Sequence, residues 1–370
     1  MSNARKLADN LPTEGQLGIG RNMLINGDMS IAQREVTSYA VGDGHGYKNV
    51  DRWKVFAGNT AGRCTMQRNT DAPPGFNYSL KFSCTTADTS IAANESFGIA
   101  QYPEAGNCTL ARHGTSEAKQ LTLSFYAKAD STKTYVAQIL NNKHSGYIHN
   151  NRAVTVTSSW QRFEMTFQAD TTADSKMDGT LTDAGFAVMF YLHAGSDLTS
   201  ATLASDWATG VTNRAAGTQS FFSSTNNRFY LTGCQLEVGD KATPFEHEPV
   251  GVTLAKCQRY FYQPINVTSG STQRFGFYTA SAYSDGTVVY GTYQFPVPMR
   301  AAPTYAVTNI SSFKMRFGAD TTSTSSSYHG TASSHTITPV FYATGTTFTA
   351  GRHGWVEALG GGKVSFDAEL

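Results

Sequence analysis

Few residues in this chain could act in catalysis, and their spacing matches neither a metal-binding motif nor a motif for a catalytic nucleophile. The nine histidines include His144 and His149, with His45 upstream. Between the first two, Ser145-Gly146 indicates a turn, so the helical spacing of a metal site is not met. Serines are abundant, but no Gly-x-Ser-x-Gly elbow occurs in a strand-turn-helix context. We therefore expect these histidines to be exposed loop residues.

Glycan cleavage generally needs two carboxyl groups that flank the scissile bond. The candidate acids are Asp88, Glu95, Glu117 and Asp183, and nothing in the sequence pairs any two of them. The repetitive signature of a β-helix depolymerase is also missing. The sequence therefore predicts a protein that is not an enzyme.

Carbohydrate binding demands less, because an exposed aromatic ring and a few amide or hydroxyl groups suffice. Tyr47, Tyr147 and Trp207 lie in Gly/Asn/Ser-rich segments typical of loops, and Tyr328 lies in a Ser/Thr tract. Exposed aromatic residues in loops often mark recognition sites. These four are the candidate ligand-binding residues. The alternative for each is a loop anchor that packs back onto its own domain.

The overall composition excludes several classes of partner. Charged residues make up 15% of the chain, against about 25% in an average soluble protein, and the formal net charge is +1. Basic residues are scattered, whereas phosphate binding needs a concentrated basic face, so we expect no nucleic-acid partner. No apolar run approaches a membrane span, and the first 21 residues lack the apolar core of a signal peptide. We therefore expect that the protein is synthesised in the cytoplasm and does not insert into a membrane.

The five cysteines form an odd set without a C-x2-C pair, at positions 64, 84, 108, 234 and 257. A disulfide framework or a zinc knuckle is disfavoured by this spacing and by the absence of a secretion signal. We predict buried free thiols.

Alternation of apolar and polar residues dominates residues 22–250. Leu121, Leu123, Phe125 and Ala127 alternate with polar or half-polar neighbours, which predicts a half-buried strand. Further strands are expected at 135–140, 153–157, 163–167, 186–192 and 229–238, all rich in β-branched or aromatic residues. Eight to ten such strands make a two-sheet sandwich of jelly-roll order the economical architecture.

A short helix is expected at 253–262, because apolar residues recur there at helical spacing. We place the domain boundary at this helix, which gives a sandwich over 22–250 and a smaller all-β domain over 251–370. In that domain, strands are predicted at 275–282 and 287–295, and the Ser/Thr tract 320–335 is interpreted as a long exposed loop. Residues 1–21 are interpreted as an arm or linker.

Several phrases, taken together and in this order, resemble the sequences of bacteriophage tail-fibre and related virion structural proteins. They are NMLINGDMS (22–30), VDRW (50–53), TSSWQR (157–162), QLEVGDKATPFE (235–246), CQRY (257–260) and FPVPMRAAPT (295–304). The first domain is also similar to jelly-roll carbohydrate-binding modules, which open on an Asn-x-x-x-Asn-Gly phrase and close on Gln-Leu-Glu.

The resemblance to tail fibres implies a virion location, a homotrimer, attachment to other tail or head proteins through residues 1–21, and presentation of the β domains to a host surface glycan. A structural calcium is common in the related modules. Here Gly233 and Cys234 replace two of the usual acids, so only Asn26, Asp28 and Glu237 could hold calcium, and we expect no cofactor. Two alternatives to a short tail fibre stay open, namely a head decoration or knob protein and a polysaccharide-degrading tail enzyme.

Overall fold

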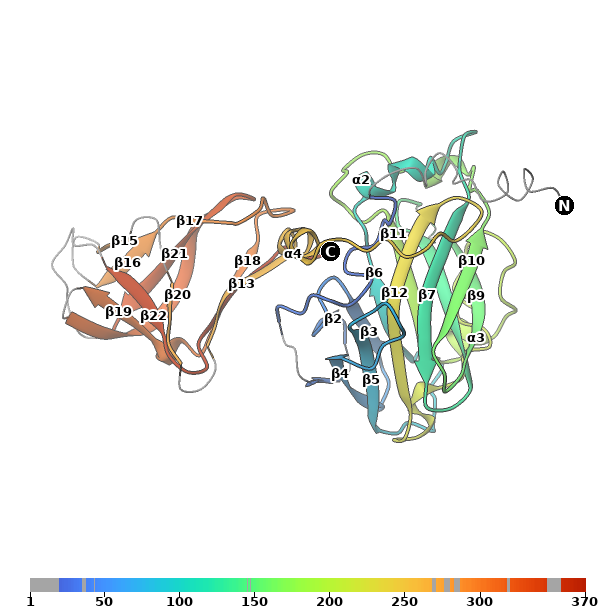
Figure 1. Cartoon of the computed structure of the whole chain (residues 1–370), viewed down its shortest axis with the longest axis horizontal. Coiled ribbons are helices and arrows are strands. Elements are labelled where there is room, and N and C mark those ends of the chain that lie inside the picture. The colour runs from blue at the N-terminus through green and yellow to red at the C-terminus, as the bar shows by residue number, and fades with distance from the viewer. Residues whose placement is uncertain are drawn as a thin grey trace. The chain divides into compact units, whose positions relative to one another are not determined.

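The computed structural model describes residues 20–34, 38–42, 44–144, 146, 148–267, 271–275, 280–282, 287–317, 320–344 and 354–370. The chain forms two compact units (Figure 1). Unit 1 ends at Thr253 and also includes Leu370, whereas unit 2 runs from Leu254 to Glu369. Of the predicted arm, only its last two residues lie within the described part of the chain. No helix among the described residues is long and apolar enough to cross a membrane.

Unit 1 is a sandwich of two six-stranded antiparallel sheets, as the alternating sequence predicts. Sheet 1 contains, in spatial order, β1 (Ser38–Val41), β4 (Arg63–Asn69), β5 (Ser79–Thr86), β12 (Arg228–Val238), β7 (Leu121–Ala129) and β10 (Gln161–Phe167). Sheet 2 contains β2 (Gly46–Tyr47), β3 (Lys54–Gly58), β6 (Ser96–Gln101), β11 (Phe186–Ala194), β8 (Lys133–Asn141) and β9 (His149–Val156).

The pairing of these strands is nested, which defines the jelly roll. β8 pairs with β9, β7 with β10, β6 with β11 and β5 with β12, all antiparallel. Each pair encloses the previous one in the sequence, as in a long hairpin that is wrapped around a core. The predicted jelly-roll sandwich is therefore confirmed.

The core between the sheets is built by the inward residues of every strand. Along β7, Leu121, Leu123, Phe125 and Ala127 are buried in it, as the alternation predicts. Trp53 is fully buried, and its ring centroid lies 6.4 Å from that of Phe190. All five cysteines are buried free thiols, in agreement with the prediction.

The two phrases that open and close the sandwich pack against each other. The Asn22 side chain accepts from the Leu236 amide (3.1 Å) and donates to the Cys234 carbonyl (3.1 Å). At Gly27, a Cβ atom would lie 2.1 Å from that same Cys234 oxygen, so only glycine fits there. Asn26 takes the left-handed conformation (φ 57°), and its carbonyl accepts from Trp53 Nε1 (3.0 Å). These two sequence segments therefore have a structural role, because they hold the beginning and the end of the sandwich together.

The helical elements are short. Among the described residues of unit 1 they include α2 (Ala105–Cys108), η2 (Thr109–Ala111), η3 (Ala173–Ser175), α3 (Ser196–Thr199) and η4 (Phe221–Ser223). α4 (Val250–Gln258) is the helix expected between the domains, but it begins and ends earlier than predicted. It begins after Pro249, whose carbonyl accepts from the Val252 amide (2.8 Å), and proline suits a helix start. The segment after it is needed for a strand that opens with Phe261.

Beyond α4, the described part of unit 2 is formed by β-strands, with an additional 3-10 turn, η5 (Ile310–Ser312). Its smaller sheet contains β13 (Phe261–Asn266), β23 (Lys363–Asp367) and β18 (Thr304–Thr308). The larger sheet contains β14 (Gln273–Phe275), β22 (Trp355–Ala358), β19 (Phe313–Phe317), β20 (Asp320–Ala332), β21 (Thr336–Ala343), β16 (Val288–Gly291) and β15 (Ala280–Ala282), with β17 (Tyr293–Gln294) beside β21.

The interpretation of the Ser/Thr tract as a loop was wrong. β20 is a long strand that pairs with β19 on one side and with β21 on the other. Thr322 and Thr324 point inward and are buried, and the Thr324 hydroxyl donates to the carbonyls of Phe313 (3.0 Å) and Ile310 (2.7 Å). Because these hydroxyls find backbone acceptors, the tract can enter a sheet without large apolar residues.

Candidate glycan-binding groove on sheet 2

The outer face of sheet 2, which points away from the sandwich core, carries a second apolar cluster. Along β11, Val188 and Phe190 point into the core, whereas Met189 and Tyr191 point outward. The outward residues pack with Phe56 of β3 and with neighbouring aliphatic residues of β6 and β8. Sheet 2 therefore buries apolar side chains on both faces, which is unusual for the outer face of a sandwich.

A groove of about 440 Å³ lies on this outer face, within the roughly 300–1,000 Å³ typical of small-molecule sites. Its floor is apolar and aromatic, with Phe56, Met189 and Tyr191 buried and Tyr102 half-buried. Its remaining lining residues are His45, Lys54, Ser96, Leu140, Asn142, Leu198 and Arg214. Leu198 and Arg214 come from the long connection between β11 and β12, which covers part of the sheet face.

Gly98 of β6 gives the groove its aromatic floor. A Cβ atom at this position would lie 2.5 Å from the tip of the Phe56 ring and 2.0 Å from the Phe190 carbonyl. The glycine therefore leaves room for Phe56 to lie across β6, where it makes an edge-to-face contact with Tyr191 at 5.1 Å between centroids.

Two tyrosines and two cations set the polarity of the groove. Burial raises the pKa of Tyr102 and of Tyr191, and the nearby Arg214 offsets part of this rise. Both phenols therefore stay protonated at neutral pH and keep a hydroxyl that can donate or accept. Arg214 donates to Gln138 Oε1 (2.8 Å), and Lys54 Nζ lies 5.2 Å from the Tyr102 ring centroid.

This lining can hold the two surfaces that a sugar presents. Apolar rings and aliphatic side chains can contact sugar C–H faces, and hydroxyl, amide and cationic groups can bond sugar oxygens. Glycosidases use two carboxyl groups, and among the described lining residues there is no Asp or Glu.

The four aromatic residues predicted from the sequence are not brought together. Tyr47, in edge strand β2, lies next to the groove, since Lys54 Nζ is 5.5 Å from its ring centroid. Trp207 is a loop anchor, because its Nε1 donates to the Gln168 carbonyl (2.7 Å) and its ring packs on the edge of His113. Tyr147 lies outside the described residues.

Tyr328 belongs to a separate hollow of about 500 Å³ in unit 2. Its side chain is 49% exposed, and its ring stacks on Tyr342 with centroids 5.7 Å apart. Tyr305, His329 and three serines line the same hollow. This hollow offers aromatic and hydroxyl groups on the surface of the second unit.

The sequence did not reveal Tyr102, Tyr191 or Arg214. Tyr191 lies in a strand that is apolar on both faces, so alternation could not tell which side chains point outward. Arg214 reaches Tyr191 (5.9 Å from Cζ to the ring centroid) only because of how the long connection folds back. No local sequence motif indicates how this connection folds.

The three possible calcium ligands are engaged by groups of the protein itself. Asn26 Oδ1 accepts from the Ile31 amide (2.9 Å), and Asp28 Oδ1 accepts from the Ser30 hydroxyl (3.0 Å). The buried Glu237 accepts from the Thr243 hydroxyl (2.7 Å) as well as from other donors. Their hydrogen bonds give these residues roles in loop geometry.

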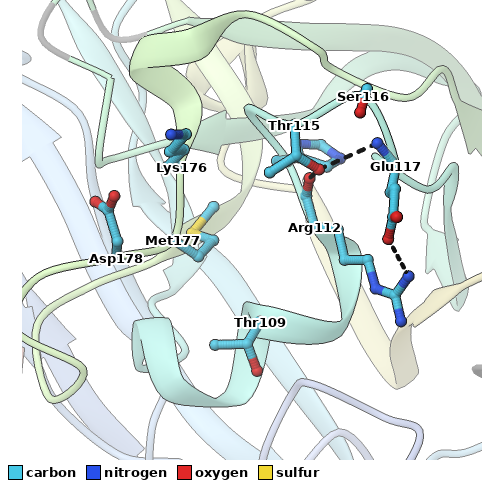
Figure 2. Close-up of a pocket in the computed structure, with 9 residues that line it drawn as sticks. Thr109, Arg112, Thr115, Ser116, Glu117, Lys176, Met177 and Asp178 are labelled. Carbon is cyan, nitrogen blue, oxygen red and sulfur yellow. Dashed lines mark hydrogen bonds and ion pairs between the residues drawn. The ribbon is translucent and has the colours of Figure 1, made fainter.

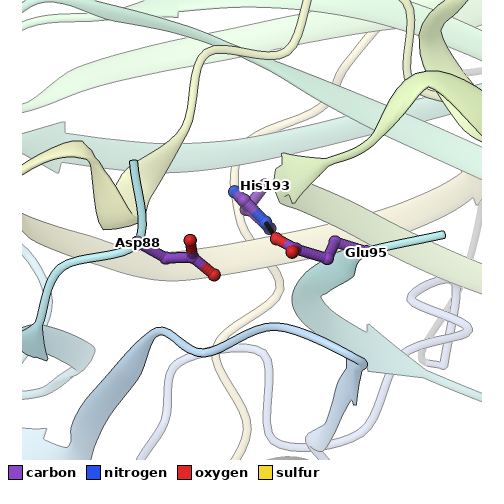
Figure 3. Close-up of side chains that lie close together, drawn as sticks. All are labelled: Asp88, Glu95 and His193. Atoms are coloured by element: carbon purple, nitrogen blue, oxygen red, sulfur yellow. Dashed lines mark hydrogen bonds and ion pairs between the residues drawn. The ribbon is translucent and has the colours of Figure 1, made fainter. Parts of the chain in front are cut away.

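Two of the four candidate acids do meet, at a buried cluster with His193 (Figure 3). The polar atoms of Asp88, Glu95 and His193 lie within 4.8 Å of one another. His193 shares hydrogen bonds with Glu95 (2.8 Å) and with the Ser220 hydroxyl (2.8 Å), and Asp88 accepts from the Thr60 hydroxyl (2.9 Å). These bonds tie the segment before β6 to the end of β11, and a metal ion would have to displace them.

The other two acids form ion pairs at the surface, Glu117 with Arg112 (2.6 Å) and Asp183 with Lys143 (3.6 Å). The first pair lines a hollow of about 480 Å³, in which Lys176 and Asp178 lie opposite (Figure 2). Its described lining residues include no Tyr, Trp or Phe. It is therefore a weaker candidate for sugar binding than the groove on sheet 2.

No protein-family model and no curated protein sequence matches the chain. Among solved structures, it is similar to a CBM4 carbohydrate-binding module, with 15% identity over 58% of this chain and 98% of that chain, at a TM-score of 0.29. It is also similar to a family 11 carbohydrate-binding module from Clostridium thermocellum, solved in complex with a β-1,3-1,4-mixed-linked tetrasaccharide. The identity is 15% over 57% of this chain and 99% of that chain, at a TM-score of 0.29.

The enzymatically active domain of tailspike protein 4 from bacteriophage CBA120 is also similar, with 10% identity over 59% of this chain and 22% of that chain, at a TM-score of 0.30. TM-scores this low do not establish a fold by themselves. The jelly-roll assignment rests on the nested strand pairing described above.

Proposed function

We propose that unit 1 binds a glycan in the groove on the outer face of sheet 2. The observation that carries this proposal is the combination of an aromatic floor, made by Phe56, Tyr102 and Tyr191, with polar and cationic lining residues in an open groove. Tyr102 is half-buried, so its ring still offers apolar surface to a ligand, and the polar groups beside it can form hydrogen bonds. A sugar can contact both.

The substitution Tyr102→Ala tests this assignment, because Tyr102 is half-buried and can be removed with a modest loss of packing. We expect binding to host surface polysaccharide to weaken by about fivefold or more, since truncation of an aromatic contact commonly costs over 1 kcal/mol. Tyr126→Ala is the matched control, because Tyr126 is a half-buried tyrosine on sheet 1, where it packs on Phe76. Equal loss in both variants would contradict the proposal.

We further propose that the chain is a structural protein of a bacteriophage virion, most specifically a homotrimeric short tail fibre that contacts the host surface. Support comes from the sequence segments between residues 22 and 304 that resemble, in the same order, those of phage virion structural proteins. Gold labelling of the protein in intact particles tests its location, and density on the head would favour the decoration protein instead. Light scattering tests the trimer, and a mass near that of one 40.0 kDa chain would contradict it.

The protein is proposed to bind its glycan without cleaving it. The absence of acids from the described groove lining supports this, as does the burial of the meeting pair Asp88 and Glu95. Incubation with host polysaccharide followed by a reducing-end assay is the direct test. Release of oligosaccharides would make the chain a tail enzyme.

A further inference from the structure

Arg214 is a partly buried cation that has no carboxylate partner among the described residues. Its guanidinium donates to the neutral Gln138 Oε1 (2.8 Å) and lies 3.7 Å from the Met189 sulfur. Its Cζ atom is 5.9 Å from the Tyr191 ring centroid. Charges that are withdrawn from water are normally paired, so an arginine with only neutral contacts in a groove is poised for an anion.

The charged groups of the described lining residues are those of Arg214 and Lys54. Lys54 is a second cation in the lining, and its ammonium also donates to the main-chain oxygen of Leu370 (2.9 Å). The described lining residues include no Asp or Glu. The whole chain carries a formal net charge of only +1. The positive charge of the groove is therefore a local feature, which favours an anionic ligand.

The planar fork of donors on the guanidinium matches the paired oxygens of a carboxylate or of a phosphate. Of these two groups, the carboxylate of a sugar acid is attached directly to the sugar ring. The aromatic floor beside it can contact the ring of the sugar that carries this carboxylate. We propose that the groove selects glycans with carboxylated sugars, such as uronic acid residues, and binds the carboxylate at Arg214. This inference rests on the proposed glycan-binding function.

An array of bacterial surface polysaccharides, grouped as uronic-acid-containing, sulfated and neutral, tests the inference with the full-length protein. We expect binding to the uronic-acid group, and loss of that binding when the carboxylates of the same polysaccharide are chemically reduced to alcohols. Binding that prefers neutral or sulfated glycans would overturn this inference and leave the proposed function standing. No binding to any glycan would overturn both.

Variants of Arg214 connect the selectivity to this side chain. Arg214→Gln should weaken binding of a uronic-acid polysaccharide by about ten- to hundredfold, as expected for loss of hydrogen bonds to a charged group. Its affinity for the carboxyl-reduced polysaccharide should stay unchanged. Arg63→Gln makes the same charge change in sheet 1, where Arg63 bonds the Thr60 carbonyl, and should have no effect on either ligand.

Arg214→Lys keeps the charge and protects the test against misfolding of the glutamine variant. We expect intermediate binding, because lysine offers the charge without the planar fork. Equal binding by wild type, Arg214→Lys and Arg214→Gln would show that Arg214 does not hold the carboxylate, provided that all three unfold at similar temperatures.

Discussion

The ammonium group of Lys54 lies between two tyrosine rings, 5.2 Å from the centroid of Tyr102 and 5.5 Å from that of Tyr47. Lys54 thereby connects the groove on sheet 2 with edge strand β2. Tyr47, which was predicted as a ligand-binding residue because its surroundings are typical of a loop, thus lies beside the groove. The main residues of the groove were not predicted from the sequence.

Gly27→Ala should destabilise unit 1, because the new Cβ atom would lie 2.1 Å from the Cys234 carbonyl oxygen. Overpacking of this kind costs about 1–3 kcal/mol. Gly251→Ala is the control, since a Cβ atom there meets nothing within 4 Å. Chemical denaturation of both variants measures the difference, and equal stability would contradict the close packing of the opening and closing phrases.

His113 should make the fold sensitive to mild acid. Burial lowers the pKa of His113 to about 4, although Asp170 and the Lys119 carbonyl oppose the shift. An unfolded histidine titrates near 6.5. As pH falls from about 6.5 to 4, the unfolded chain therefore takes up a proton that the folded chain does not, and the free energy of unfolding drops by up to about 3 kcal/mol.

The variant His113→Phe removes this titration and keeps an aromatic ring against Phe186 and Trp207. Unfolding curves at a series of pH values should show that the stability of wild type relative to His113→Phe declines between pH 6.5 and 4. A difference that stays constant over this range would disprove the assigned protonation state.

The cysteines should be inert in the folded protein. Burial raises the pKa of Cys108 to about 12 and that of Cys234 well above its usual value, so neither forms a thiolate near neutral pH. A thiol reagent should label none of the five cysteines under native conditions and all five after denaturation. Labelling of the native protein would indicate that the sandwich opens readily.

Tyr328→Ala should leave stability almost unchanged, because the side chain is 49% exposed. If the unit 2 hollow also contacts the host surface, adsorption of the protein to host cells will weaken, while the affinity of the sheet 2 groove for its glycan will not. Tyr290→Ala, which removes another exposed tyrosine of unit 2, is the control. Unchanged adsorption would restrict recognition to unit 1.

The parts of the fold that the sequence predicted are those that depend on local alternation. The alternation of apolar and polar residues from Leu121 to Ala127 predicts β7, because one face of that strand is apolar and buried and the other is polar. Local reasoning failed at 320–332, where Thr324 satisfies its hydroxyl on backbone carbonyls of another segment. It failed at Arg214 for the same reason, since the neighbours Gln138 and Tyr191 come from distant strands.

Hydrogen–deuterium exchange with and without a bound host polysaccharide tests whether the glycan binds in the groove on sheet 2, because it maps the site without any substitution. We expect slower exchange in β3, in β6 and the segment through Tyr102, in β11, and around Arg214, with sheet 1 unchanged. Protection that leaves these segments untouched, or that falls on the loops of sheet 1 or on unit 2 alone, would contradict the assignment of the groove.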